Sequence, residues 1–199
     1  CALTPFRHYV MGEESMERAA SVAEMNEVTL PLREAMEAGA FGFTTTSAPQ
    51  HLGYKGRPLA CRLASHDELR SYSHVLRDLG RGSIEIALTS QASKVNADER
   101  ALLELFLSES GRPVTWLALL NRDDDPDAVQ NTLVETADLI ARGAIPQCTC
   151  RPFIFQIDCS KPFILASMAC WVPVLNQPVE RQIEILRSPK FRAEFREAL

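Results

Sequence analysis

The most constraining feature of this sequence is one pattern that occurs four times along the chain. A short apolar run typical of a β-strand is followed by a longer run whose apolar residues have helical spacing. Repetition of strand and helix is typical of a parallel sheet with right-handed crossovers. The strands are expected at 40–44, 83–90, 113–120 and 144–150, and helices at 21–38, 66–79, 96–110, 125–143, 179–188 and 190–198.

Two architectures fit such a repeat. An open doubly wound sheet usually carries a phosphate-binding glycine turn, but G-x-G-x-x-G and G-x-x-x-x-G-K-[ST] are both absent. A (β/α)8 barrel needs about 250 residues, so four units form about half of one. We therefore predict an α/β fold, namely a partial (β/α)8 TIM barrel of about four consecutive βα units with parallel strands. A different α/β sheet stays an alternative.

The two ends of the sequence suggest a piece of a longer chain. The first residue is Cys1, and the last residues, "FRAEFREAL", continue a helical pattern. We expect residues 1–199 to form a single segment, the central part of a barrel, with both ends truncated.

Local signals predict where the helices begin and end. Ser21 and Glu24 form a capping box before the first long helix, and Pro31 inside that helix predicts a kink or a break. Other helices are expected to begin after Ser65 and Asp125. The expected stops are Gly39, Gly80 and Gly111.

Composition excludes several classes of protein. The chain is 46% hydrophobic and 24% charged with a formal net charge of −5, which is ordinary globular composition without a basic excess for nucleic acid or an anionic membrane. No apolar run approaches the roughly 20 residues of a membrane span, and the N-terminus lacks the regions of a signal peptide. The six cysteines lack the spacing of a disulfide framework, so we expect a cytoplasmic protein.

Two long stretches resemble a known family. "FRHYVMGEESMERAAS" and "EAGAFGFTTTSAPQHLGYKGRPLACRLAS" are similar to the N-acyl-D-amino-acid deacylase branch of the amidohydrolase superfamily, the D-aminoacylase group. The later stretches "CRPFIFQIDCSKPFILASMACW" and "VERQIEILRSPKFRAEF" resemble the later part of the same proteins. The resemblance runs along nearly the whole chain in one register.

This resemblance implies a hydrolase acting on carbon–nitrogen amide bonds in a longer parent protein. Such a parent would deacylate small N-acylated amino acids with water activated by zinc or another divalent metal. The family's H-x-H metal pair and its catalytic aspartate fall outside these residues, so no catalytic residue and no metal ligand is assigned here. The chain would contribute barrel strands and a substrate loop, would need the remainder of its own barrel as a partner, and would be inactive alone.

The expected strand ends motivate an alternative function. They carry Thr89-Ser90 and Leu120-Asn121, where the family has metal-binding histidines, and no histidine follows His74. A family member without a metal, acting as a small-molecule binding or regulatory protein, would fit these residues.

The loop after the first expected strand supplies most of the candidate substrate-binding residues. Thr45, Ser47 and His51 are expected to point into a substrate pocket above the barrel, and Arg57 or Arg62 to bind a carboxylate, because a guanidinium presents a planar fork that matches its two oxygens. The alternative is a structural loop whose hydroxyls cap backbone groups. Ser47 and His51 as nucleophile and base is a weaker interpretation, because the G-x-S-x-G elbow and an orienting acid are missing. The candidates are Thr45, Ser47, His51, Arg57 and Arg62, together with His8.

Two other clusters have simpler interpretations. Cys148, Cys150 and Cys159 could offer thiolates to a metal, but without C-x-x-C spacing we interpret them as small core residues. The acidic run 122–126 lacks the pattern of a calcium loop and is interpreted as helix-capping acids.

Overall fold

The computed structural model describes residues 1–53, 56–152, 154, 156, 158–160, 162 and 165–198, without the side chain of Ser167. The chain divides into two compact units. The first contains Cys1–Ala48 and Ala60–Pro152, and the second contains Pro49–Leu59 and Phe153–Leu199. That the whole chain is one segment of a barrel stays a prediction.

A four-stranded parallel sheet forms the centre of the first unit. Its strands are β1 (Gly42–Thr46), β2 (Ser83–Ala87), β3 (Val114–Leu119) and β4 (Ala144–Cys148). Their order in the sheet is the order in the sequence, and all three pairings are parallel.

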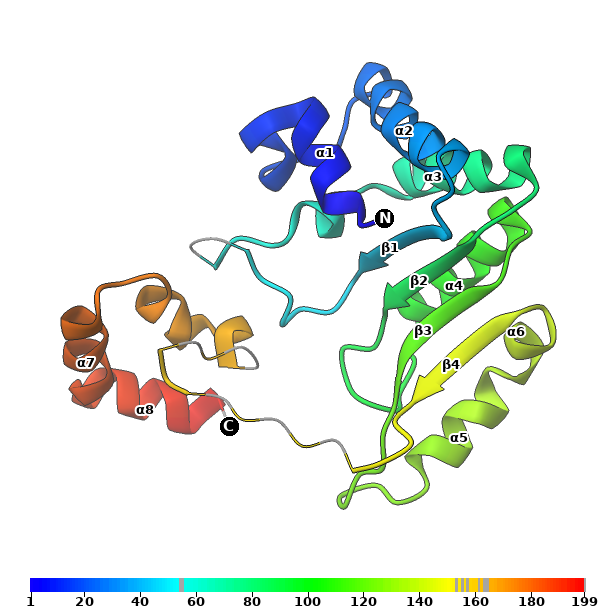
Figure 1. The fold of residues 1–199 in the computed structure, drawn as a ribbon. Coiled ribbons are helices and arrows are strands. Elements are labelled where there is room, and N and C mark those ends of the chain that lie inside the picture. Colours follow the sequence, from blue (N-terminus) through cyan, green and yellow to red (C-terminus); the bar gives the residue numbers. More distant parts are fainter. Residues whose placement is uncertain are drawn as a thin grey trace. The chain divides into compact units, whose positions relative to one another are not determined.

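This strand order distinguishes the two predicted architectures. When each right-handed crossover leads to the next strand in the same direction, every connecting helix falls on the same face of the sheet. A doubly wound sheet reverses its order and covers both faces. Helices α3 (His66–Leu79), α4 (Ala97–Ser110), α5 (Ala128–Glu135) and α6 (Ala137–Ala141) lie along one side of the sheet (Figure 1). The prediction of a partial TIM barrel is confirmed.

The first two residues extend the sheet beyond β1. The carbonyl of Cys1 accepts a hydrogen bond from the Thr44 N–H at 2.6 Å, and Ala2 forms a parallel bridge with Thr44. Helix α1 (Leu3–Met11) and the 3-10 helix η1 (Gly12–Met16) follow directly. A short extended segment therefore continues the parallel order on the β1 side.

Helix α2 (Val22–Glu37) begins as its sequence indicates and then departs from the prediction. Ser21 and Glu24 form both hydrogen bonds of the capping box. Pro31 lies inside one continuous helix, so of the predicted kink or break the break is wrong, and a kink at Pro31 stays a prediction. The residues on both sides of the proline explain this, because Val28 and Leu32 are 0% exposed and their burial outweighs one lost backbone hydrogen bond.

Of the other helix boundaries, some lie where they were predicted and others do not. Ser65 caps α3, and Gly80 and Gly111 end α3 and α4 in the left-handed conformation, as predicted. The single helix predicted over 125–143 is instead two helices, α5 (Ala128–Glu135) and α6 (Ala137–Ala141).

Side-chain hydrogen bonds explain the break between α5 and α6. The hydroxyl of Thr136 donates to the carbonyl of Thr132 at 2.7 Å, a backbone contact that bends helices.

The start of α5 also differs from the prediction. Helix α5 begins three residues after Asp125, whose carbonyl accepts a hydrogen bond from the Ala128 N–H at 3.2 Å, and no side chain caps the helix. The prediction of Asp125 as the N-cap is wrong.

The core of the first unit lies between the sheet and its helices. The ring of Phe43 packs on Tyr72 of α3 and on Phe106 of α4, with ring centroids 6.0 Å apart in both pairs. Further buried strand residues on this side are Ile84, Ile86, Val114 and Trp116.

The second unit has a small core of its own. It contains the 3-10 helices η4 (Leu165–Ser167) and η5 (Ala169–Val174) and the predicted helices α7 (Val179–Arg187) and α8 (Pro189–Ala198). Trp171 is 2% exposed and packs edge-on against Phe191, with ring centroids 5.2 Å apart.

Among the described residues, no helix has the length and apolar character to cross a membrane.

Candidate functional site

The carboxyl edge of the sheet is where a parallel α/β fold gathers the groups that can do chemistry. Ser47 follows β1, Leu88 and Thr89 follow β2, and Leu120 follows β3. Because the strands are parallel and adjacent, these residues come to the same edge. The arrangement therefore provides a row of hydroxyl and backbone groups at the place expected for a substrate.

Most of these hydroxyls hold neighbouring strand ends together. Ser47 donates its hydroxyl proton to the carbonyl of Leu88 at 2.8 Å. Ser93 Oγ donates to the carbonyl of Leu120 and accepts from the Leu120 N–H, both at 2.6 Å. Ser93 itself has a positive φ of 53° and is 1% exposed. In this structure the hydroxyls act as cross-strand ties.

A buried carboxylate closes the loop between β2 and α4. Glu99 is 5% exposed, and its two oxygens accept hydrogen bonds from the Ser90 N–H at 2.6 Å and the Asn96 N–H at 2.9 Å. Asn96 in turn caps α4 by accepting from the Glu99 N–H. Because one carboxylate oxygen binds Ser90 and the other binds Asn96, Glu99 fixes the loop between β2 and α4.

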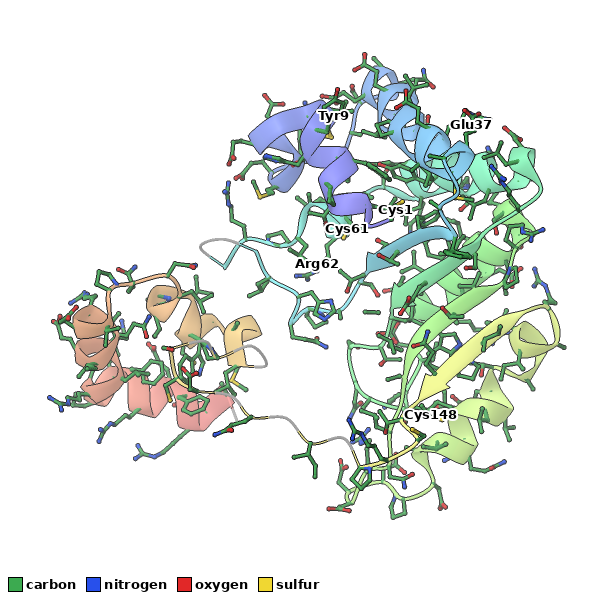
Figure 2. The ribbon with its side chains drawn as sticks, in the orientation of Figure 1. Cys1, Tyr9, Glu37, Cys61, Arg62 and Cys148 are labelled. Carbon is green, nitrogen blue, oxygen red and sulfur yellow. The ribbon has the colours of Figure 1, made fainter. Side chains whose placement is uncertain are left out.

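Arg62 is the candidate residue that the fold places best for carboxylate binding. It lies on η3 (Ala60–Leu63), a 3-10 helix that contacts both α1 and β1. Its side chain is partly exposed and lies near the carboxyl end of β1 (Figure 2). A guanidinium there can form two parallel hydrogen bonds to a carboxylate.

The remaining candidates are distributed over both units. Thr45 on β1 shares a face with Phe43 because residues two apart in a strand point the same way, and Phe43 packs against the helices. His8 is exposed on α1. His51 and Arg57 belong to the second unit, where Gln50, Leu52 and Gly53, next to His51 in the sequence, line a hollow of about 240 Å³. The structure thus brings Ser47 and Arg62 to the end of β1, and the substrate-binding role of all six stays a prediction.

The open face of the sheet carries polar residues that the sequence interpretation did not select. Thr44, Glu85 and Thr115 lie side by side in register across three strands, and Ile145 continues the row on β4. Glu85 is half-buried, and Ile145 is 50% exposed. The period-two pattern of "SIEIA" and "VTWLAL" is the signal that identifies this row, since Ile84, Ile86, Val114 and Trp116 take the other face.

The cysteines are a correction to the sequence interpretation. Cys148, Cys150 and Cys159 are all exposed, so the assignment of these three as core residues is wrong. Cys148 ends β4, which is the last strand in the order of the described sheet. Figure 2 shows Cys148 at this strand end.

The residues at the strand ends do not fit a metal centre. No group of three or more His, Cys, Asp or Glu side chains able to hold a metal occurs within the described part of the chain. The hydroxyl of Thr89 contacts the Leu117 carbonyl at 3.3 Å, and Glu99 is engaged with backbone N–H groups. In the acidic run, Asp124 pairs with Arg122, which lowers the pKa of that carboxyl.

Comparison with known proteins supports the fold. No protein-family model matches the chain, and no curated protein matches it. Solved structures of D-aminoacylases do match. One, a D-aminoacylase that defines a novel subset of amidohydrolases, has a TM-score of 0.56 at 16% identity over 72% of this chain and 28% of its own.

Two further D-aminoacylase structures give similar values. One, examined for the functional role of its binuclear metal center, has a TM-score of 0.56 at 17% identity over 72% of this chain and 28% of its own. The other, a mutant in complex with CuCl2, has a TM-score of 0.58 at 15% identity over 80% of this chain and 31% of its own. The chain thus spans less than a third of these proteins and is similar in fold to part of their structures.

Proposed function

We propose that the chain is part of an amidohydrolase that cleaves the amide bond of N-acylated amino acids. The observation that carries this proposal is the parallel sheet, whose strands follow one another in sequence order. The structural matches to D-aminoacylases cover 72% to 80% of the chain. The sequence resemblance over "FRHYVMGEESMERAAS" and the loop 45–64 points to the same proteins. The structural matches use backbone geometry, and the sequence resemblance uses residue identity.

Within this function, the chain would supply the substrate loop at the carboxyl edge. Arg62 would bind the carboxylate of the amino-acid part, with Arg57 as the second candidate. Thr45, Ser47, His51 and His8 stay the other candidates for substrate contact. Any catalytic metal of the longer protein would be held largely by residues beyond those of this chain, and no group of three or more possible metal ligands occurs among the described residues. The cytoplasmic location stays a prediction from composition.

An assay of amide hydrolysis tests this proposal. The longer protein that contains this chain is incubated with N-acyl-D-amino acids and N-acyl-L-amino acids, and release of the free amino acid is followed. We expect hydrolysis of at least one series. A folded protein that hydrolyses neither series would contradict the proposal.

A second candidate function is favoured by the strand ends. Thr89, Ser93 and Glu99 are used in backbone hydrogen bonds, an arrangement that suits a rigid binding protein as well as an enzyme. In a binding or regulatory protein without a metal, N-acyl amino acids would bind without being cleaved. Calorimetric titration distinguishes the two, because a binder gives a stable saturable signal whereas an enzyme consumes its ligand.

A further inference from the structure

Arg7 on α1 is a charged side chain with no exposure to solvent. Its guanidinium is 0% exposed and pairs with Glu68 of α3, also 0% exposed, through Nε and Oε1 at 2.8 Å. Removing two charges from water costs several kcal/mol for each ion unless the geometry and the added hydrogen bonds are good. A pair buried this completely therefore requires a structural reason.

The other donors of Arg7 supply that reason, because they bind three backbone carbonyls from different segments. Nη1 donates to the carbonyl of Ser15 at 2.8 Å and to the carbonyl of Ala60, and Nη2 donates to the carbonyl of Arg18 at 3.0 Å. Buried carbonyls need donors, and apolar side chains of similar size offer none. A guanidinium is the side chain whose fixed fork can reach Glu68 and all three carbonyls together.

One of these contacts fixes η3. Ala60 is the first residue of η3 and is 1% exposed. A second hydrogen bond from α1 reaches the same helix, since the Cys61 N–H donates to Thr4 Oγ1 at 3.3 Å. A single 3-10 turn is not stable by itself, so η3 depends on such contacts for its conformation.

We propose that Arg7 is a positioning residue for Arg62. By holding the carbonyl of Ala60, Arg7 fixes the turn that presents the Arg62 guanidinium at the carboxyl end of β1, and Glu68 orients Arg7. This inference rests on the proposed function, because the ligand of Arg62 is the carboxylate of the N-acylated amino acid. Arg7 itself touches no substrate.

Two substitutions test the shape of the Arg7 side chain and the charge of its partner Glu68 separately. Arg7→Lys keeps the positive charge but replaces five donors in a fork with one nitrogen, so it loses contacts to the carbonyls. Glu68→Gln keeps an acceptor where Oε1 stands and removes the negative charge. The second carboxylate oxygen, Oε2, is buried and accepts no hydrogen bond from the residues that the structure describes.

Amide hydrogen exchange on the 199-residue chain measures the positioning directly. In Arg7→Lys we expect the amides of 60–64 to exchange about tenfold faster or more, while the amides of β2, β3 and α4 keep their protection. Arg33→Lys is the matched control, because Arg33 is 39% exposed in its ion pair with Asp78 and this change should alter nothing. Unchanged protection of 60–64 in Arg7→Lys, or an equal loss over the whole first unit, would overturn the proposal.

Glu68→Gln keeps the test decisive if Arg7→Lys does not fold. Loss of the counter-ion loosens Arg7, so faster exchange is again expected at 60–64 and not in β2 or β3. Protection that falls equally in all three segments would show a general stabilising pair and would overturn the proposal.

Kinetics of the longer protein distinguish positioning of Arg62 from a purely structural role of Arg7, because a purely structural role would not depend on the carboxylate of the substrate. With an N-acyl amino acid, Arg7→Lys should raise KM about tenfold and change kcat little, as should Arg62→Ala. With the matching N-acyl amino-acid amide, which lacks the carboxylate, neither variant should change KM. Equal losses on both substrates would overturn the proposal. If the unmodified protein hydrolyses neither substrate, the proposed function fails, whereas hydrogen exchange still decides whether Arg7 positions η3.

Discussion

Replacement of Gly42 by alanine tests the close approach of β1 and β2. Gly42 has a φ of +147° and pairs in register with Ser83. A Cβ atom at Gly42 would lie 1.8 Å from the Ser83 carbonyl oxygen and 2.8 Å from its carbonyl carbon. These are backbone atoms, so the contact cannot be relieved by rotation of a side chain.

The expected cost follows from two terms. An alanine at this φ is strained by about 1–3 kcal/mol. Ser83 must also move away from β1, which weakens adjacent ladder hydrogen bonds worth about 0.5–1.5 kcal/mol each. Together we expect the free energy of unfolding of the first unit to fall by about 3–5 kcal/mol. Gly39→Ala is the matched control. Gly39 has a φ of +105°, and a Cβ atom there would have no atom within 4 Å, so the only expected cost of this variant is the backbone strain.

Urea denaturation followed by tryptophan fluorescence measures both variants. The sequence has two tryptophans, Trp116 in the first core and Trp171 in the second. In a Trp171→Phe background the fluorescence comes from Trp116 alone and reports the first unit. If Gly42→Ala costs no more than Gly39→Ala, the close backbone contact between β1 and β2 is refuted.

Three further predictions concern other parts of the structure. Burial, and then the nearby Glu68 carboxylate, raise the pKa of Tyr72 above its usual range. An unfolded tyrosine ionises near pH 10 while the buried one keeps its proton, so stability should fall as pH rises above about 10, and Tyr72→Phe should flatten this dependence in alkaline denaturation curves. Ser93→Ala removes both hydrogen bonds to Leu120 and should cost about 1–3 kcal/mol in urea denaturation; no measurable cost would contradict the tie. Trp171→Ala should cost about 3–5 kcal/mol and remove the exchange protection of α7 and α8, and preserved protection would contradict the second core.

Local signals in the sequence were sufficient for much of the fold. Ser21 and Ser65 mark helix starts, and Gly80 and Gly111 mark helix ends, because capping uses groups within a few residues of the terminus. The order of strands and helices limited the fold to two architectures, and the absence of a phosphate-binding glycine turn favoured the partial barrel. Chirality and connection rules limit what such an order can form.

The failed predictions depend on contacts between distant residues. Pro31 is tolerated because the buried face of α2 holds the helix together on both sides. The break at Thr136 comes from hydrogen bonds that link Thr136 to Thr132 and Thr132 to the carbonyl of Ser93. The burial of α2 and the contact of Thr132 with Ser93, which lies 39 residues away, cannot be recognised from neighbouring residues alone.

The residues of the candidate site could likewise be predicted from the sequence only in part. The loop after β1 could be selected from its hydroxyls and arginines, but the burial of Arg7 could not, because its partners are 8 to 61 residues away in the sequence. Thr44, Glu85 and Thr115 could have been found from the alternation of their strands. Cys148 was misjudged because cysteine is usually buried, whereas here it ends an exposed edge strand.

The most direct test of the account is the rate of N-acyl-amino-acid hydrolysis by the longer protein before and after metal removal. We expect hydrolysis that is lost when a chelator removes the metal and restored when a divalent metal is added back. A folded protein that contains no metal and does not hydrolyse these substrates would contradict the central claim, and would leave a barrel that binds small molecules without cleaving them.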